Sequence, residues 1–261
     1  MPIVFTAILP HPPLLIPSIG KDNLRLLEKT LTSYKKIEQE FYVSHPDTLV
    51  VISPHGHIHN NAFSINLHPK FTVQFEEFGD FSIKKNFQGD VMLAHRIRES
   101  LETIPLQLQS YETLDHGTSV PLFLLSEHLP KLKVIPIYHS GQDLKAHFEF
   151  GQLTKKELYK SKERIAIVAS GDLSHTLSKK SPAGYSPKSK KFDKKVIDYL
   201  LEERKEDFLD LDPQIIDEVC ACGLKSIAVL LGIIDGTRHK KQLLSYEAPF
   251  GVGYMAMRIA F

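Results

Sequence analysis

Short apolar runs, each ended by a turn-forming or polar segment, recur along the chain and predict β-strands. Strands buried on both faces of a sheet read as continuous apolar runs, whereas strands with one exposed face alternate apolar and polar residues. Continuous runs lie at residues 3–9, 47–53, 133–139 and 164–170, alternating runs lie at 62–68 and 71–76, and residues 242–261 end in a further strand. We therefore expect a sheet whose central strands are covered on both sides.

Between these runs, apolar residues recur at helical spacing. In residues 21–43, for example, Leu27 and Leu31 fall on one face of a helix. Asp90 suits the positive end of a helix dipole, and Pro121 falls in a first turn, where proline is tolerated. The same reasoning predicts further helices at residues 89–104, 117–129, 192–203, 212–223 and 224–234.

The alternation of strands with helices predicts an α/β fold, with a mostly parallel or mixed sheet covered by helices on both faces. The sequence has 261 residues and shows no internal repeat, long linker or low-complexity tract. We therefore expect a single domain over residues 1–261.

Composition excludes several classes of protein. Hydrophobic residues make up 42% of the chain and charged residues 24%, as in an ordinary globular protein, and the formal net charge is +1. A net charge so close to zero favours neither nucleic acid nor an anionic membrane as a partner, and the lysine-rich stretch 178–195 is interpreted as a solvated loop and helix start. No apolar stretch reaches the roughly 18 residues of a membrane span.

The N-terminal and cysteine patterns favour a reducing compartment. The first residues lack the basic segment and small-residue cleavage site of a signal peptide. Only two cysteines occur, Cys220 and Cys222, and at one residue apart in a predicted helix they are poorly placed to form a disulfide. A cytoplasmic location is expected.

Histidines follow the continuous apolar runs at the point where each strand is predicted to end. His11 follows the first run and His55 the second. His139 ends the third run, and His175 follows the fourth after a Gly-Asp-Leu-Ser turn. Ligands of open α/β sheets gather beyond the carboxyl ends of the strands, and imidazole is the commonest protein metal ligand. The sequence thus predicts a site at this edge of the sheet, with His11 and His55 as the best-placed pair of metal ligands.

Further polar residues lie in the loops near this edge, and each has an ordinary structural alternative. His57 lies farther out in the loop after His55. Asp115 or Thr118 is placed to cap the following helix, whereas His116, beside the helix N-terminus, could donate a proton or hydrogen bond to a bound anion.

Three more side chains complete the set of candidates. Asp172 is placed to orient an imidazole, and His175 is a candidate general acid or base. Glu247 lies between two aromatic residues and before two glycines, and is either a buried hydrogen-bonded carboxylate or a site residue. The remaining histidines are expected to be ordinary residues, on helices for His95, His128 and His147 and in turns for His45, His68 and His239.

Six motifs resemble, in the same order, those of the catalytic LigB-type subunit of class III extradiol ring-cleavage dioxygenases. They read LPHPPLLIP, DTLVVISPHG, LDHGTSVPLF, VASGDLSHTL, ACGLKSIAVLLG and LLSYEAPFGVGY. The resemblance is closest to the branch related to the Memo proteins, also called AmmeMemoRadiSam system protein B, and it covers essentially the whole chain. Six ordered motifs are far more specific than any single short pattern.

The resemblance implies a role for each matching residue. His11 and His55 match the two metal-binding histidines of the family, and His175 matches the acid–base histidine. His116 matches a second active-site histidine near substrate and dioxygen. The third metal ligand is Glu in ring-cleaving members, His in zinc-dependent members and Cys in Memo-like members, and Cys222 is the matching residue here.

A second candidate for the third ligand is Glu218. It lies four residues before Cys222, so on a continuous helix the two side chains would share one face. His57, Asp172 and Glu247 are expected in the surroundings of the metal or substrate.

The thiol at the third-ligand position leaves two principal functions open. The first is an oxidoreductase of the extradiol dioxygenase superfamily that binds Fe(II) and acts with O2 on a catechol-like aromatic substrate. The second is a Memo-like metal-binding redox or modification factor that works with partner proteins, since thiolate is softer than carboxylate, binds Zn(II) or Cu(I) well and is oxidisable. Fe(II) is the expected metal, with Zn(II) or Cu as alternatives.

Two other functions fit the sequence less well. A metal-free binding domain would require every strand-end histidine to be an ordinary loop residue. A zinc hydrolase would need a water-activating pattern such as His-Glu-x-x-His, which the sequence lacks. The expected partners are a small aromatic molecule and O2, or a partner protein, and a homodimer is possible. The chain ends soon after its last predicted strand, so we expect any additional domain to be a separate polypeptide.

Overall fold

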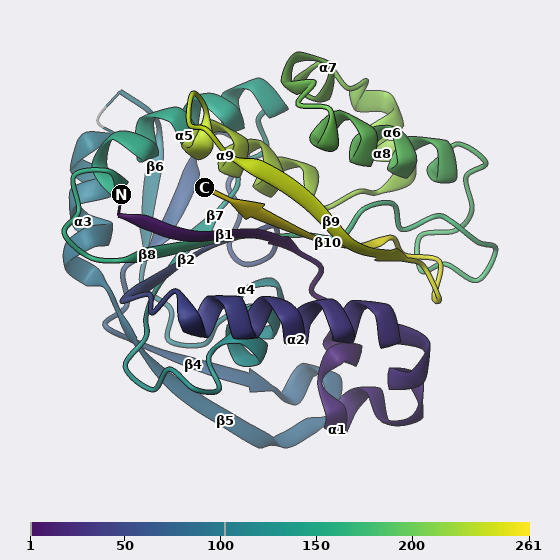
Figure 1. Cartoon of the computed structure of the whole chain (residues 1–261), viewed down its shortest axis with the longest axis horizontal. Helices are drawn as coiled ribbons and strands as arrows, with labels where there is room; N and C mark the ends of the chain where they lie inside the picture. Colours follow the sequence, from purple (N-terminus) through teal and green to yellow (C-terminus); the bar gives the residue numbers. More distant parts are fainter. Residues whose placement is uncertain (1, 102) are drawn as a thin grey trace.

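The computed structural model describes residues 2–101 and 103–261, and within them ten strands form one mixed sheet (Figure 1). The strand order is β4 (Lys70–Phe75), β5 (Asp80–Gly89), β7 (Lys133–Tyr138), β2 (Thr48–Ser53), β8 (Ile165–Ser170), β1 (Ile3–Leu9), β10 (Tyr254–Ala260) and β9 (Lys240–Glu247). Off this path, β3 (Phe63–Asn66) pairs with β7 and with β6 (Leu106–Gln109). The four central strands β7, β2, β8 and β1 are mutually parallel, whereas β4, β10 and β9 pair antiparallel to their neighbours.

Helices cover both faces of this sheet (Figure 1). One face packs against α2 (Glu28–Val43) and α4 (His116–Leu125), and the other against α3 (Val91–Ser100), α5 (Leu144–Leu158), α6 (Ser189–Leu201) and α9 (Leu224–Ile234). Short helices connect these elements: α1 (Pro17–Gly20), α7 (Lys205–Leu209), α8 (Pro213–Val219), and the 3-10 turns at Pro13–Leu15, Lys21–Leu27 and Glu76–Phe78.

Strand β2 shows why the central apolar runs are continuous. Val50 and Ile52 belong to the core on the α9 side, and Leu49 and Val51 belong to the core on the α2 side. Successive side chains of a strand point to opposite faces, so both sets are buried only when both faces are covered. The α/β fold with a mixed, doubly covered sheet is therefore confirmed.

The element boundaries agree best where the apolar pattern is strongest. The strand at 3–9 and the helix at 224–234 have the predicted limits, and the other three central strands differ from prediction by a single residue at one end. The helix predicted at 117–129 ends at Leu125, so His128 lies in a turn and not on a helix. The helix predicted at 212–223 ends at Val219, because Cys220 adopts the left-handed conformation with φ 54°.

Several elements are absent from the prediction, among them strands β5, β6 and β9 and helices α5 and α7. Strands β5 and β6 are largely exposed and carry few buried apolar residues, so the apolar pattern is weak there. Helix α5 contains Gly151, which is a poor helix former but lets α5 approach α9 closely, since a Cβ there would lie 2.1 Å from the carbonyl oxygen of Val229.

No described helix is both long enough and apolar enough to cross a lipid bilayer.

The fold buries a neutral histidine outside the strand ends, and this residue makes stability depend on pH. His147 on α5 is fully buried; its Nδ1 donates to the carbonyl oxygen of Asp143 at 2.6 Å, and its Nε2 accepts the Ser140 N–H at 3.1 Å. Burial is the main cause that lowers the pKa of His147 to about 4. Because the folded-state pKa lies below the unfolded value, this residue stabilises the fold above about pH 6.5, and the stabilisation is lost as the pH falls.

We expect the unfolding free energy contributed through His147 to fall by about 2 kcal/mol between pH 7 and pH 5. The His147→Leu variant should be less stable than the natural protein at pH 7, because the Ser140 N–H loses its acceptor. Its stability should fall less between the two pH values. Urea unfolding at both pH values measures this, with His95→Gln on the exposed face of α3 as the control. Equal pH slopes for the natural protein and His147→Leu would contradict the assignment.

Candidate metal centre

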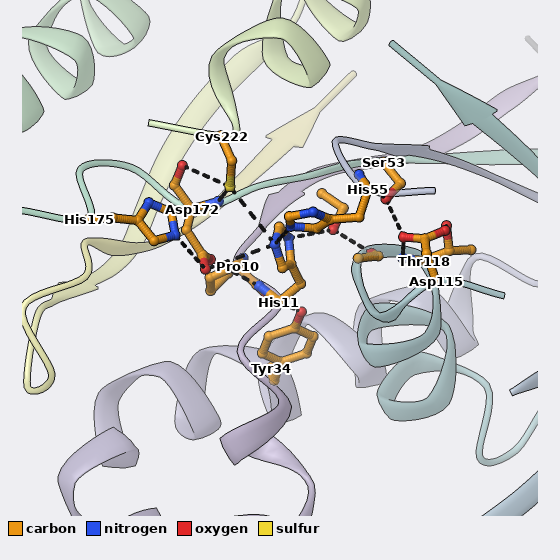
Figure 2. A network of polar contacts seen from close by, with 12 residues as sticks. Pro10, His11, Tyr34, Ser53, His55, Asp115, Thr118, Asp172, His175 and Cys222 are labelled. Carbon is orange, nitrogen blue, oxygen red and sulfur yellow. Dashed lines mark hydrogen bonds and ion pairs between the residues drawn. The ribbon is translucent and has the colours of Figure 1, made fainter. Parts of the chain in front are cut away.

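The parallel central strands bring three predicted site residues together at one edge of the sheet. His11 follows β1, His55 follows β2 and Asp172 follows β8, each two residues beyond the strand. Figure 2 shows His11 in the middle of the resulting network, with His55 on one side and Asp172, His175 and Cys222 on the other. The predicted convergence of strand-end side chains is present in the structure.

Hydrogen bonds fix the position and the tautomer of His11. Its backbone N–H donates to Asp172 Oδ1 at 3.1 Å, and its Nδ1 lies 3.0 Å from Ser170 Oγ. The Ser170 hydroxyl donates its own proton to the Gly117 carbonyl oxygen at 2.5 Å. The Ser170 oxygen can then only accept from the imidazole, so the proton of neutral His11 is on Nδ1 and its Nε2 carries a free lone pair.

The free Nε2 of His11 faces His55. The two Nε2 atoms lie 3.0 Å apart. Two imidazole nitrogens that bind one ion at about 2.0–2.1 Å, with an angle between them of roughly 90–110°, are separated by about 2.8–3.4 Å. Burial is the main cause that lowers the pKa of His55 to about 3, and it also holds the pKa of His11 well below its usual value. Both side chains are therefore neutral near pH 7, which is the form that binds metal.

His55 is held by a chain of hydrogen bonds that runs to the start of α4. The His55 backbone N–H donates to Ser53 Oγ at 3.2 Å, and the Ser53 hydroxyl donates to Asp115 Oδ1 at 2.6 Å. The same carboxylate caps α4 by accepting the Thr118 N–H at 3.0 Å, as the sequence suggested. His116, the first residue of α4, stacks on His55 with ring centroids 4.1 Å apart. The helix cap therefore also orients two of the candidate imidazoles.

Cys222 reaches the opposite side of His11. Its Sγ lies 3.9 Å from His11 Nε2 and accepts the Asp172 N–H at 3.3 Å. Asp172 Oδ2 also lies 3.9 Å from His11 Nε2. Burial raises the pKa of the Asp172 carboxyl to about 7, and burial together with the Asp172 charge raises the pKa of the Cys222 thiol. The thiol and the carboxyl therefore lie in the same buried environment beside His11.

Two glycines allow this approach of the α8–α9 connection to the end of β8. A Cβ on Gly171 would lie 2.0 Å from the Gly223 Cα, so neither backbone leaves room for a side chain. The Gly223 N–H donates to the Asp172 carbonyl oxygen at 2.9 Å. This contact sets Cys222 against Asp172.

The structure groups the possible ligands into two sets that share His11. His11, His55 and His116 form one set, in which the ligand atoms lie within 4.8 Å of one another. His11, Asp172 and Cys222 form the other. The predicted ligands His55 and Cys222 are thus both neighbours of His11 but lie in different sets. The neutral, correctly oriented His11 and the nature of its donor neighbours fit a metal ion.

Glu218 is not part of either set, so the expectation that it shares a helix face with Cys222 is wrong. Helix α8 ends at Val219, and the left-handed Cys220 turns the chain before Cys222 is reached. The exposed Glu218 carboxylate accepts from the Ser186 hydroxyl and from the Lys188 ammonium, both at 2.6 Å.

His175 lies beside the network and not within either ligand set. Its Nε2 is 4.0 Å from Asp172 Oδ2, and its backbone N–H donates to the Val219 carbonyl oxygen at 2.8 Å. Burial lowers the pKa of His175, so its ring is neutral near pH 7. A neutral imidazole next to a buried carboxyl is suited to accept a proton.

Two residues that were expected near the metal or substrate, His57 and Glu247, make other contacts. His57 is exposed and stacks on Tyr111, with ring centroids 3.9 Å apart. Glu247 accepts from the backbone N–H and the hydroxyl of Thr30, at 2.8 and 2.6 Å. Of the two roles suggested for it, these contacts favour the hydrogen-bonded carboxylate over the site residue. The residue that the sequence reasoning missed is Ser170; its signal was a small polar residue at the end of a buried apolar run.

A cleft of about 840 Å³ opens beside Cys222. Its walls come from the loops after β2 and β7, the start of α5, and the segment from α7 to the start of α9. A molecule in this cleft would have direct access to the thiol side of the cluster.

Comparisons with known proteins agree with this architecture. Residues 5–257 match the family described as the catalytic LigB subunit of aromatic ring-opening dioxygenase. The chain is 30% identical over 263 residues to Protein CA_C1420 of Clostridium acetobutylicum, an alignment that takes in 97% of this chain but only 56% of that protein. The crystal structure of the uncharacterized protein JW3007 from Escherichia coli K12 has the same fold, with a TM-score of 0.69 and 18% identity over 99% of this chain and 100% of that one.

The tautomer of His11 generates a test. We expect Ser170→Ala to weaken metal binding about 10- to 100-fold, because His11 loses the acceptor that keeps its proton on Nδ1. Titration of the protein with Fe(II) or Zn(II) against a competing chelator measures the affinity. Ser33→Ala, at a buried serine hydroxyl on α2 that donates to Ser245 on β9, is the control. Unchanged affinity in a folded Ser170→Ala protein would refute the assigned tautomer.

Proposed function

Because the chain belongs to the LigB family, we propose that it is a metal-dependent oxidoreductase that acts with O2 on a catechol-like aromatic substrate, with Fe(II) at the cluster centred on His11. The observation that carries this proposal is the pair of neutral imidazoles whose Nε2 atoms lie 3.0 Å apart. His11 and His55 are the first two ligands. Cys222 or, in its place, the Asp172 carboxylate would be the third; both are neighbours of His11 in the second set, so binding together with His55 would need a shift of side chains.

Bound Fe(II) would supply a centre that chelates the two oxygens of a catechol and transfers electrons to O2. The chain's own groups would handle the protons. His175 Nε2 is free to accept the proton of a substrate hydroxyl, and Asp172 Oδ2, 4.0 Å away, stabilises the imidazolium that forms. His116, stacked on His55, lines the same centre from the α4 side.

A second candidate function is favoured by the thiol itself. Cys222 offers a soft sulfur donor where ring cleavage is expected to use a carboxylate, and such a site suits Zn(II) or Cu(I). On this proposal the chain is a Memo-like redox or modification factor whose substrate is presented by a partner protein. Since the chain spans 56% of its Clostridium relative, the activity of that longer protein need not reside in the matched part alone.

Oxygen uptake tests the first function. The protein is loaded with Fe(II) under anaerobic conditions and then given O2 and a panel of catechols. We expect O2 consumption with a matching loss of catechol absorbance, and a kcat about 10²- to 10⁴-fold lower in His175→Gln, because the proton acceptor is removed. His95→Gln, exposed on α3, should not change the rate. Iron-loaded protein that consumes no O2 with any catechol would exclude ring cleavage.

Metal content tests whether the thiol is a ligand, which the second function requires. We expect Cys222→Ser to lower the Zn(II) or Cu(I) content of the purified protein strongly, because a hydroxyl replaces a thiolate donor. Cys220→Ser, at the exposed cysteine two residues earlier, should leave the content unchanged. Elemental analysis of both variants beside the natural protein gives the answer. Unchanged metal in Cys222→Ser would remove the thiol from the site and leave Asp172 as the anionic ligand.

A further inference from the structure

A buried carboxylate on α6 contacts the turn that joins Asp172 to His175. Asp193 is fully buried, and its Oδ1 accepts the Ser174 backbone N–H at 3.0 Å together with the Ser174 hydroxyl. Its Oδ2 accepts the Tyr246 hydroxyl at 2.6 Å. Burial raises the pKa of the Asp193 carboxyl, and the hydrogen bonds from Ser174 and Tyr246 oppose that rise. The function proposed above makes no use of this group.

Gly253 makes room for the carboxylate and holds the same turn. A Cβ on Gly253 would lie 2.3 Å from Asp193 Oδ2, so a larger residue would displace the carboxylate. The Gly253 N–H donates to the Ser174 carbonyl oxygen at 2.9 Å, and the Gly253 carbonyl oxygen accepts the Leu173 N–H at 2.8 Å. The two middle residues of the turn are therefore bonded by Asp193 and Gly253.

The residues at the two ends of this turn belong to the candidate site. Asp172 Oδ1 accepts the His11 N–H, and His175 Nε2 lies 4.0 Å from Asp172 Oδ2. Ser174 is fully buried, so loss of the Asp193 carboxylate would leave its N–H and hydroxyl without an acceptor. The turn would have to move to satisfy them, and the residue next to Ser174 is His175.

We propose that Asp193 is a positioning residue for His175: by anchoring Ser174 it keeps the imidazole at its place beside Asp172. The inference rests on the proposed function, in which His175 accepts the proton of a substrate hydroxyl. Asp193 acts through Ser174 and is not itself a catalytic residue. The same contact gives a structural reason for Tyr246 and Gly253 in the LLSYEAPFGVGY motif.

Nuclear magnetic resonance of the metal-free full-length chain, with 15N-labelled histidine, tests this without any turnover. We expect Asp193→Ala to shift or split the His175 imidazole resonances, because Ser174 is released. Asp193→Asn should leave them close to those of the natural protein. Its amide oxygen can accept from Ser174, and its amide NH2 can donate to the Tyr246 hydroxyl oxygen.

Asp90→Ala is the matched control. Asp90 is another buried carboxylate, but it accepts from the Thr48 hydroxyl at 2.6 Å and from the Leu93 N–H at 3.1 Å, at the start of β2 and of α3. Its removal should also lower the stability of the fold, because buried donors lose their acceptor. The His175 resonances should not change, which separates positioning of the ring from a general loss of stability.

Steady-state kinetics of the iron-loaded protein give a second readout. We expect Asp193→Ala to lower kcat about 10- to 100-fold, because the proton acceptor is displaced. KM should change by less than about twofold, since Asp193 does not contact the substrate. Asp193→Asn should retain most of the kcat, and Asp90→Ala should retain all of it.

If Asp193→Ala does not fold, Ser174→Ala takes its place, since it removes the hydroxyl donor alone and should shift the same resonances. Unchanged His175 resonances in the folded variant, an equal change in Asp90→Ala, or an equal loss of kcat in Asp193→Asn would overturn the inference. Failure of the proposed function looks different: the resonances would respond as expected while the iron-loaded natural protein consumed no O2. O2 consumption that Asp193→Ala leaves unchanged would refute only the role of Asp193.

Discussion

The Ser170 hydroxyl is the contact on which the site depends. It lies at the end of β8, donates to the Gly117 carbonyl oxygen in α4 and accepts from His11 after β1, so one buried group joins three elements. In a low-dielectric interior such a chain of hydrogen bonds is stronger than in water, and leaving any member unpaired is expensive. The arrangement therefore stabilises the junction of sheet and helix, and at the same time it selects the imidazole tautomer that exposes Nε2.

A second constraint is the contact between the backbones of Gly171 and Gly223. No Cβ fits between these two residues, so the backbones of the loop after β8 and the loop before α9 are in direct contact. Burial raises the pKa values of both Asp172 and Cys222, and the Asp172 charge adds to the effect on the thiol. Burying two acidic groups side by side is unfavourable, and such arrangements are common at sites that bind a cation or hold a proton.

The sequence allowed the sheet and the His11–His55 pair to be predicted, because parallel strands bring their carboxyl ends to one edge whatever the details of the loops. The outcome for Glu218 could not be predicted in this way. Its position depends on where α8 ends, and that is decided by the left-handed conformation of Cys220, a non-glycine residue that gives no sequence signal for such a turn. The exposed position of His57 and the contact of Glu247 with Thr30 likewise depend on loop paths and on tertiary contacts, which local patterns do not encode.

His11 is shared by a nitrogen-rich set and a set with a thiol and a carboxyl, and this sharing bears on metal choice. Oxygen donors suit harder ions and thiolate suits softer ones, so an ion bound beside His11 would decide whether Asp172 or Cys222 becomes the anionic ligand. The two acidic groups each make ionisation of the other more costly, as the effect of the Asp172 charge on the thiol shows. A cation placed between them would favour ionisation of the nearer group. That group would then lose its proton and bind the cation as an anion. On the proposed function, the same pocket would therefore present an iron-like or a zinc- or copper-like ligand set without any change in the backbone, and selectivity would rest on the protonation of two neighbouring side chains.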